Sequence, residues 1–382
     1  MPSLLTIFLR FLGLGCICFG GPIAHIGYFE REFVDRLRWL ERGRFTELLA
    51  LAQFLPGPAS SQTVFAIGYE KAGLRGGVAA FTGFVLPSFL IMYSLAVHGE
   101  TLLDADLYAR VVYGLKLLAV VVVANAVMSM AARFCRSPAR ALLAVATAAA
   151  ILLAGVFYVQ YLCLAAAALA GMLLFRDEQN RRPAGGGFRY GYLAAFAVLL
   201  VGLFVLAPFS EPVRIVNGFY QAGSFVFGGG HVVLPLLQNF FGEAMDSERF
   251  LTGYAAAQAI PGPMFTIASY LGPELLPQAP LAAAVACTLA IFTPGFLLLL
   301  GLHRNLDTLR GNPSINAAFQ GVNAAVVGLL AAAFYTPVIT SIVHSLTEVL
   351  LVAAGLVISR VFKPNIALLV AAYVAVGIML GR

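Results

Sequence analysis

Two histidines stand within apolar sequence, each shortly after a pair of glycines, and their side chains could hold protons inside a membrane. His25 ends the stretch FGGPIAH, and His231 ends FGGGH. Histidine titrates near neutral pH, and an ionisable residue within a membrane segment is a functional candidate by default. A protonated imidazole would attract an anion, so loss of its proton could couple anion release to a proton gradient. A neutral histidine bonded to a loop carbonyl is the alternative, and the sequence leaves both open.

Glycine and proline motifs interrupt the apolar segments near these histidines, and such interruptions can bind anions. In FGGP at 19–22 and LPGP at 55–58 a helix stops and then restarts. The restart exposes unpaired backbone N–H groups and the positive end of a helix dipole, and glycine lets an anion approach the backbone. Because related motifs recur later in the chain, we predict that several helix N-termini point at one site for a small oxyanion. Kinks or close packing points would use the same residues.

Polar side chains accompany the breaks. ASSQT follows the first PGP motif and places hydroxyl and amide donors in the next helical turn, whereas MFTIAS after the second offers only Thr266 and Ser269. Gln53 and Gln258, three residues before their PGP motifs, could donate amide hydrogens to an oxyanion or could join helices.

A single charge lies deep within an apolar run. Lys116 stands in VVYGLKLLAVVVV, and Asn323 occupies its matched position later in the chain. Snorkelling of the lysine to the interface is the alternative to a binding role. With His25 and His231 as the proton-coupling candidates, the predicted substrate-binding residues are Gly20, Gly21, Pro22, Gln53, Gly57, Pro58, Ser60, Ser61, Lys116, Gly228, Gly229, Gly230, Gln258, Gly262, Pro263, Thr266 and Asn323.

The elements that must position these residues are membrane helices. Hydrophobic residues make up 60% of the 382 and charged residues 11%, with a mean hydropathy of +0.89, whereas a soluble domain averages about 45–50% apolar and about 25% charged. Runs that approach the ~20 residues of a spanning helix recur throughout. They lie at 77–97, 111–132, 141–175, 190–209, 281–302, 316–335 and 363–380. Alternating β-barrel patterning is absent, so the predicted class is an all-α polytopic membrane protein.

Other bulk features exclude several classes. The net charge of +6 comes from basic residues in short loops beside apolar runs, which indicates topology and not nucleic-acid binding. The five cysteines show no CxxC or metal spacing, and no HExxH, GxSxG or Walker motif occurs. We therefore expect no enzyme, no cofactor and no metal. The first twenty residues lack a basic start and a cleavage site, so we expect them in the mature protein.

The chain repeats itself at an offset of 205–208 residues. Four landmarks recur in the same order: LGCICFGGPIAHI at 14–26 as AGSFVFGGGHVVL at 222–234, RFTELLALAQFLPGP at 44–58 as RFLTGYAAAQAIPGP at 249–263, Pro87 as Pro294, and Gly114 as Gly321. We predict two homologous halves, 1–175 and 211–382. Between them, 176–210 holds a polar linker and an extra spanning helix.

Loop charges predict that the halves are inverted. The linker at 176–189 and the loop at 31–44 are arginine-rich and are therefore predicted to be cytoplasmic, whereas 98–109 has no lysine or arginine. In the second half 238–248, which matches the basic loop, has none, and the extra helix at 190–209 accounts for the reversal. All basic loops face the cytoplasm only if the broken segments are re-entrant hairpins. We predict four hairpins and nine spans, with the N-terminus inside and the C-terminus outside. Inverted repeats with interrupted helices are typical of secondary transporters.

With FGGP…H and AQFLPGP in one half, and FGGGH and AQAIPGP in the other, the chain resembles the chromate ion transporter (CHR) family in its long, two-domain form. The resemblance covers nearly the whole chain and implies antiparallel halves. It also implies a bacterial inner-membrane protein that exports chromate, driven by the membrane potential or proton gradient, and confers chromate resistance. The motif residues that it carries over are Gly20, Gly21, Pro22, Gln53, Pro56, Gly57 and Pro58, with Gly228, Gly229, Gln258, Pro261, Gly262 and Pro263. Pro22 has Gly230 opposite it, so the two FGG breaks need not be equivalent.

The predicted function is therefore secondary-active export of a tetrahedral oxyanion, and chromate is the leading candidate for that oxyanion. Sulfate is also a tetrahedral dianion, so a sulfate-type or other anion transporter, even one running inward, is an alternative. A passive anion channel is another, and an intramembrane enzyme using the paired histidines is a third. The expected partners are a small inorganic oxyanion and the lipid bilayer, with no nucleic acid, and a homodimer is left open.

Overall fold

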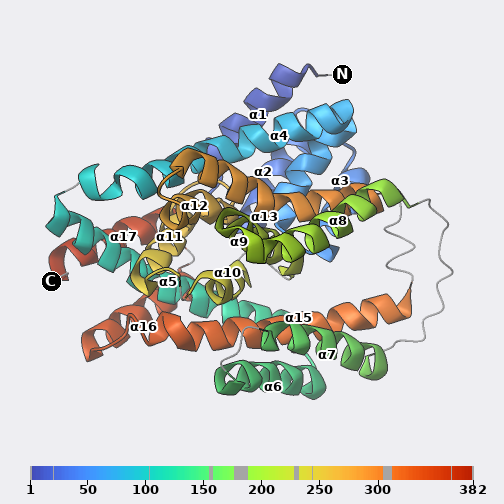
Figure 1. The fold of residues 1–382 in the computed structure, drawn as a ribbon. Helices are drawn as coiled ribbons and strands as arrows, with labels where there is room; N and C mark the ends of the chain where they lie inside the picture. Colours follow the sequence, from blue (N-terminus) through green and yellow to red (C-terminus); the bar gives the residue numbers. More distant parts are fainter. Residues whose placement is uncertain are drawn as a thin grey trace.

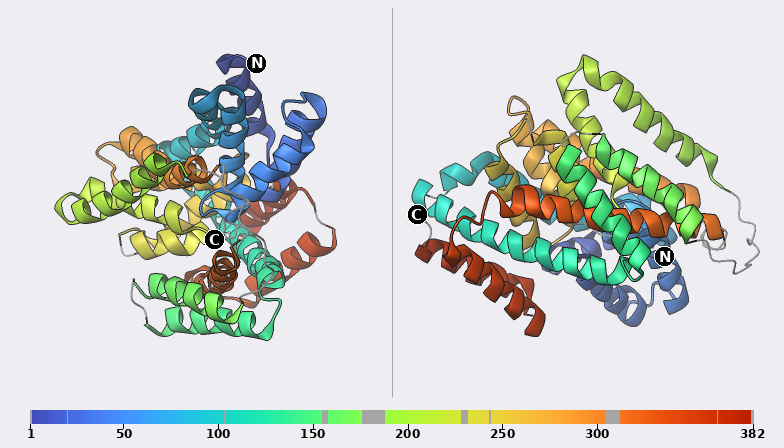
Figure 2. Two further views of the ribbon diagram at one scale, coloured as in Figure 1. Left: turned by 90° about the vertical axis from the view of Figure 1, so that its right-hand side faces the viewer. Right: turned by 90° about the horizontal axis from the view of Figure 1, so that it is seen from below.

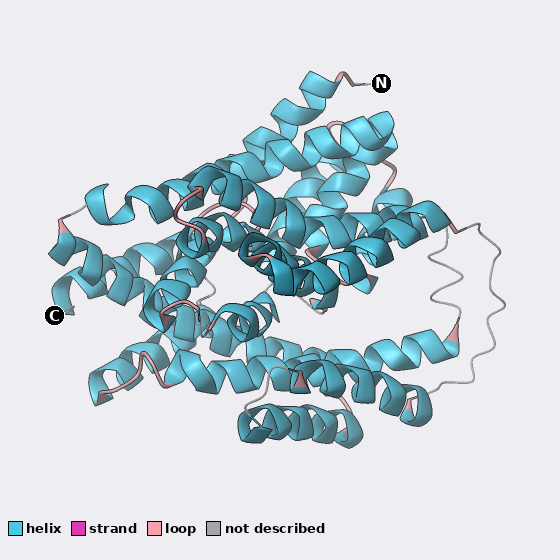
Figure 3. Ribbon diagram, viewed as in Figure 1, coloured by secondary structure: helices cyan, strands magenta, loops and turns pink. Residues whose placement is uncertain are grey.

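The computed structural model describes residues 2–19, 21–102, 104–154, 158–175, 188–227, 232–242, 244–303, 312–362 and 364–380 (Figures 1 and 3). Every regular element in these residues is a helix. Five of the described helices are long and apolar enough to cross a membrane, and four further apolar helices have 10–17 residues. The all-helical, multi-span class predicted from composition is confirmed, while the predicted number of spans stays a prediction.

The helices follow the same order in both halves. The first half contains α1 (Leu4–Ile17), α2 (Gly21–Phe29), the π-helix η1 (Glu30–Arg36), α3 (Arg42–Phe54), α4 (Ala59–Leu102), α5 (Ala105–Phe134), α6 (Pro138–Ala154) and α7 (Val159–Leu174). The connection contains α8 (Tyr190–Leu206) and η2 (Ala207–Phe209). The second half contains α9 (Glu211–Phe225), α10 (Val233–Phe241), α11 (Ser247–Ala259), η4 (Met264–Thr266), α12 (Ile267–Leu275), α13 (Pro280–Leu302), α15 (Pro313–Ala333), η5 (Phe334–Ile339), α16 (Leu346–Val361) and α17 (Ile366–Leu380).

A sharp turn divides α4 into two antiparallel segments. The backbone leaves helical geometry at Ala72 and Gly73, where Gly73 has a φ of +59° that favours glycine. The two segments then lie so close that a Cβ on Gly68 would collide with the carbonyl oxygen of Gly76, which shows that the chain folds back. We refer to 59–71 as the first segment of α4 and to 74–102 as its second segment. The first segment is the counterpart of α12, and the second is the counterpart of α13.

Two helical hairpins carry the PGP motifs at their tips. The first hairpin consists of α3 and the first segment of α4, and the second consists of α11, η4 and α12. An ion pair ties the two legs of each hairpin together at its base. Arg44 lies 2.6 Å from Glu70 in the first hairpin, and Arg249 lies 2.7 Å from Glu274 in the second. Both ends of each hairpin therefore lie at the same end of the bundle.

The segments around the FGG motifs are antiparallel pairs as well. Phe11 of α1 stacks on Phe33, which follows α2, with ring centroids 4.6 Å apart. In the second half Phe219 of α9 packs on Phe241 of α10 with centroids 4.8 Å apart. These four phenylalanines occupy matched positions at an offset of 208. Each pair of helices thus folds back on itself and does not run on as one broken rod.

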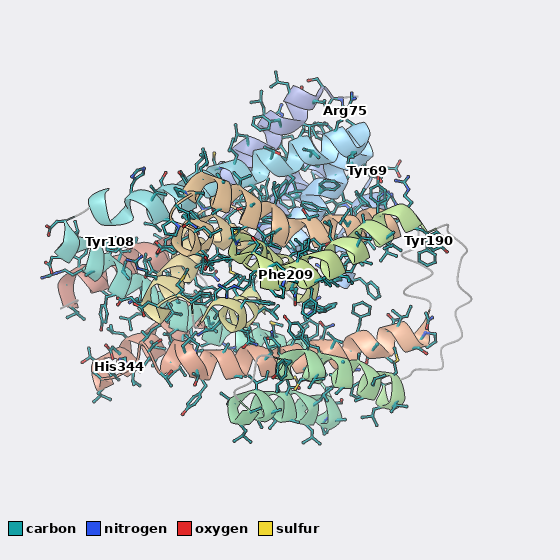
Figure 4. The ribbon with its side chains drawn as sticks, viewed as in Figure 1. Tyr69, Arg75, Tyr108, Tyr190, Phe209 and His344 are labelled. Atoms are coloured by element: carbon teal, nitrogen blue, oxygen red, sulfur yellow. The ribbon has the colours of Figure 1, made fainter. Side chains whose placement is uncertain are left out.

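The bases of the two PGP hairpins lie at opposite ends of α13. This helix begins shortly after α12, beside the second base, and ends before His303, whose Nε2 lies 2.9 Å from Glu70 at the first base. The second segment of α4 runs the other way and ends in a small pocket that also contains Glu274. A helix of 23 residues is about 34 Å long, close to the ~30 Å of a hydrocarbon core. Figure 4 shows Tyr69 and Tyr108, which lie near the two bases, at opposite ends of the bundle.

The last helices of each half pack against a helix of the other half. α15 packs on α6 and α7 of the first half, and α5 packs on α16 and α17 of the second (Figures 1 and 2). Glycines permit these crossings: Gly321 meets Gly171, and Gly114 meets Gly377. Small residues let membrane helices approach closely. The sequence halves are therefore interlocked in one bundle and do not pack as two separate bodies.

The centre of the bundle lies where the second segment of α4 meets α13. The ring of Phe81 packs edge-on against Phe292 there, with centroids 5.0 Å apart, and Phe65 of the first segment stacks on Phe296 with centroids 4.5 Å apart. By contrast, α8 lies at the periphery with no buried residue (Figure 2). An apolar helix with one face left exposed is suited to lipid and not to water.

Candidate functional site

The first FGG break places a histidine in the core. α2 starts at Gly21, which has a φ of +74°, and continues through Pro22. His25 is 1% exposed, and its Nε2 lies 3.1 Å from the carbonyl oxygen of Cys18, while its Nδ1 has no partner among the described residues. The structure thus matches the alternative given for His25, a histidine bonded to a loop carbonyl. The other ring nitrogen is buried without a bond to a described residue.

The breaks are joined in two pairs, and each pair bonds one half of the chain to the other. The backbone N–H of Gly57 donates to the carbonyl of Val226 at 2.7 Å, and the N–H of Gly262 donates to the carbonyl of Cys18 at 2.9 Å. Cys18 and Val226 each directly precede an FGG motif. The two tip glycines have φ of +115° and +101°, which explains why glycine stands there. These two N–H groups are therefore occupied by protein carbonyls in this structure.

The helix that starts after the first PGP motif retains free donors. No described residue accepts a hydrogen bond from the backbone N–H of Ala59, Ser60 or Ser61, and the first backbone bond of the helix is from Gln62 to Pro58. Ser60 is 3% exposed and Ser61 is fully buried, and neither hydroxyl is bonded to a described residue. Unpaired buried donors are costly unless a partner arrives. A dianion would supply acceptors to these groups and would also be favoured by the helix dipole.

Gln62 fastens this tip to the other half. Its side chain is fully buried, and its Nε2 donates to the carbonyls of Pro56 at 2.9 Å and Gly295 at 3.0 Å. A Cβ on Gly295 would lie only 2.8 Å from that nitrogen. The sequence indicated Gln62 as a donor in the first turn, but it stood outside the predicted binding set. Nothing in the local sequence around Gly295 marked this glycine as the partner of Gln62.

The second PGP tip has fewer free donors. The hydroxyl of Thr266 donates to the carbonyl of Pro263 at 2.8 Å, and that of Ser269 donates to the carbonyl of Thr266 at 2.7 Å. Gln258 donates its amide N–H to the thioether sulfur of Met264. The side-chain donors of this tip are thus bonded within the second hairpin, while the N–H of Gly262 is bonded to the first half.

Three predicted binding residues do not join the tips. The side chain of Gln53 is exposed although it stands near the end of α3. Lys116 forms an ion pair with Glu248, which lies in the first turn of α11 and so close to the base of the second hairpin. Asn323 is half-buried on α15, two residues beyond the glycine crossing with α7. Predictions for Gly20, Gly228, Gly229, Gly230 and His231 fall outside the described residues.

A second matched pair of histidines was missed. His98 and His303 are separated by 205 residues, the same offset as the PGP motifs, and this spacing could have revealed them. The Nε2 of His303 lies 2.9 Å from Glu70 and 3.2 Å from Arg44 at the base of the first hairpin. Burial lowers the pKa of His303 below its usual value, and the Glu70 carboxylate opposes this shift.

Both halves of the chain match one family. The family model described as chromate transporter matches residues 5–172 and 213–378. The chain is 29% identical to a chromate transport protein of Pseudomonas aeruginosa, over 85% of this chain and 79% of that protein. It is 26% identical to a chromate transport protein of Cupriavidus metallidurans, over 99% of this chain and 93% of that one.

The similarity extends to archaea. An uncharacterized transporter of Methanocaldococcus jannaschii is 26% identical over 87% of this chain and 83% of its own length. No solved structure matches the chain.

Proposed function

The chain belongs to the chromate transporter family, and we propose that it exports chromate by secondary active transport across a bacterial inner membrane. The family is one of transporters, so the chain is not an enzyme. Two relatives that cover most of its length are named chromate transport proteins. Export of chromate would confer resistance to it.

The observation that carries the proposal is the set of free donors at the first tip. The N–H groups of Ala59, Ser60 and Ser61 and the hydroxyls of the two buried serines follow Gly57, whose own N–H bonds the carbonyl of Val226 in the other half. A tetrahedral dianion could accept several such hydrogen bonds at once, and charge-assisted hydrogen bonds are the strong ones. The donors are neutral, so they can release the anion more readily than a paired cation would.

We propose that the two PGP hairpins are re-entrant and enter the membrane from opposite faces. The separation of their bases by the length of α13 supports this, as does the loop charge pattern. The base of the first hairpin would lie at the cytoplasmic face, beside the start of α8 that follows the arginine-rich linker. The base of the second would lie outside. A central site between two such hairpins is open to alternate access from either face.

The membrane potential can supply the driving force. Moving one elementary charge through about 100 mV is worth about 2.3 kcal/mol, so a dianion leaving a negative interior gains about 4.6 kcal/mol. That free energy sustains a gradient of about 2,000-fold, because each 1.4 kcal/mol is a factor of ten. Protons carried by His25 or His231 would add to this drive but are not required for export.

Inside-out membrane vesicles test the substrate. We expect vesicles that contain the protein to accumulate radiolabelled chromate more than control vesicles do, in a saturable manner. Sulfate and molybdate, being tetrahedral dianions with similar acceptors, should compete, and a phosphate series at different pH should compete only as the dianion. Strong transport of sulfate with no transport of chromate would favour the sulfate-type alternative.

The driving force is read in the same vesicles. Collapse of the potential and of the pH gradient with a protonophore should abolish accumulation above equilibrium. Flux that persists unchanged down an imposed chromate gradient in the presence of the protonophore, and that does not saturate with chromate, would identify a passive anion channel. Substitution of His25 and His231 by glutamine measures any proton contribution, since the pH dependence of uptake would then be lost.

A further inference from the structure

We propose that the two PGP tips have different roles: the first tip holds the anion, and the second supports the bundle without binding one. The inference rests on the proposed oxyanion transport and assigns the site within it. A pair of repeated hairpins would otherwise suggest two equivalent sites. The structure points to one site per chain, built by a single hairpin and held in place by the other half.

The residues that open the two restarting helices differ in size. Ala59, Ser60 and Ser61 follow the first PGP motif, and Met264, Phe265 and Thr266 follow the second at an offset of 205. All three residues of the second set are buried, and the large side chains of Met264 and Phe265 pack in the core. An anion needs close access to backbone N–H groups. On this proposal the small side chains of the first tip allow that access, and the bulky ones of the second restrict it.

The hydroxyl groups differ in availability. At the first tip Ser60 and Ser61 are buried with no described partner for either hydroxyl. At the second tip Thr266 and Ser269 are equally buried, but each donates its hydroxyl hydrogen to a carbonyl of its own hairpin. Burial is thus matched, and only the hydrogen-bonding state differs. The first tip has hydroxyl donors to offer to a ligand, whereas the hydroxyls of the second are already bonded.

The contacts between tip and opposite half also differ. At the first tip Gly57 approaches Gly295 of α13, and Gln62 fills the remaining space and bonds its carbonyl. At the second tip Gly262 lies against the side chain of Ser88, whose hydroxyl donates to Val85 in the preceding turn. The position that matches Gln62 is occupied by isoleucine, at 267. A side-chain amide therefore holds the first tip to the other half, whereas the second tip has no such amide and is held by the Gly262–Cys18 backbone bond and by packing.

Matched double substitutions test the division of roles. The first variant combines Ser60→Ala with Ser61→Ala, and the control combines Thr266→Ala with Ser269→Ala. Purified wild-type protein and both variants are reconstituted into liposomes, and exchange of internal chromate for radiolabelled external chromate is measured with no imposed gradient. We expect the first variant to raise the half-saturating chromate concentration at least about 30-fold, because a hydrogen bond to a charged group is worth about tenfold or more. The control should stay within about threefold of wild type.

The outcomes separate this inference from the proposed function. Equal losses in both variants, or a larger loss in the control, would overturn the division of roles while leaving oxyanion transport intact. A wild-type protein that exchanges neither chromate nor sulfate would overturn the proposed function and this inference with it. If the first variant fails to fold, two single-site comparisons replace it: Ser60→Thr against Ser60→Ala, and Ser61→Thr against Ser61→Ala. The threonine forms retain the hydroxyl and should transport better than the alanine forms.

Discussion

At the proposed site, Gln62 forms a side-chain hydrogen bond between the two halves of the chain. Its amide donates to two buried carbonyls, one in its own hairpin and one in α13. We expect Gln62→Met, which keeps the length and removes both donors, to lower the free energy of unfolding by about 2–4 kcal/mol. Gln53→Met in the same hairpin alters an exposed side chain and should change it by less than about 0.5 kcal/mol. Thermal unfolding in detergent compares the two, and equal stability would contradict the account.

The role of a residue at the candidate site could be predicted from the sequence only where a nearby sequence pattern indicated it. The serines after the first PGP motif were identified because they stand in the first turn of a restarting helix. The partner of Gln62 was not, because Gly295 is 233 residues away and shows no polar side chain. Lys116 was predicted to bind the anion, and no local signal pointed to its partner Glu248 in the opposite half. Long-range pairs of this kind depend on how the halves interlock.

At the scale of elements, glycines decide which helices can cross. Gly321 of α15 lies so close to the backbone of α7 that a Cβ would collide with the carbonyl oxygen of Ala167. We expect Gly321→Ala to lower the free energy of unfolding by about 1–3 kcal/mol. Gly202 of the peripheral helix α8 has no atom within 4 Å of a Cβ, so Gly202→Ala is the matched control and should be neutral or slightly stabilising. An equally mild effect of both changes would mean that the crossing is not a tight contact.

The hairpins could be predicted, and the exchange of helices could not. Glycine and proline break helices for local steric reasons, so the motifs around Gly21, Gly57 and Gly262 marked the turns and tips correctly. The partner of α5 is set by the match of two glycine-containing apolar surfaces. Helices α7 and α17 offer such a surface equally, with Gly171 and Gly377 at matched positions. Hydrophobic periodicity alone does not distinguish between them.

At the scale of the whole molecule the proposed inversion can be measured directly. Glu41 and Asn239 are exposed residues in or beside the loops that should face opposite sides. In a background with Cys16→Ser, since Cys16 is itself exposed, we expect a membrane-impermeant thiol reagent to label Asn239→Cys in intact cells stripped of the outer membrane. The same reagent should label Glu41→Cys only in inside-out vesicles. Labelling of both positions from one side would contradict the inverted arrangement.

The central claim is that this molecule moves a dianion outward under the membrane potential, and reconstitution tests it most directly. Liposomes with the purified protein are loaded with potassium, and valinomycin sets a potential of chosen size and sign before radiolabelled chromate is added outside. We predict saturable chromate uptake that rises about tenfold or more when the interior is made positive and falls when it is made negative. Uptake equal to that of protein-free liposomes at every potential would contradict the account.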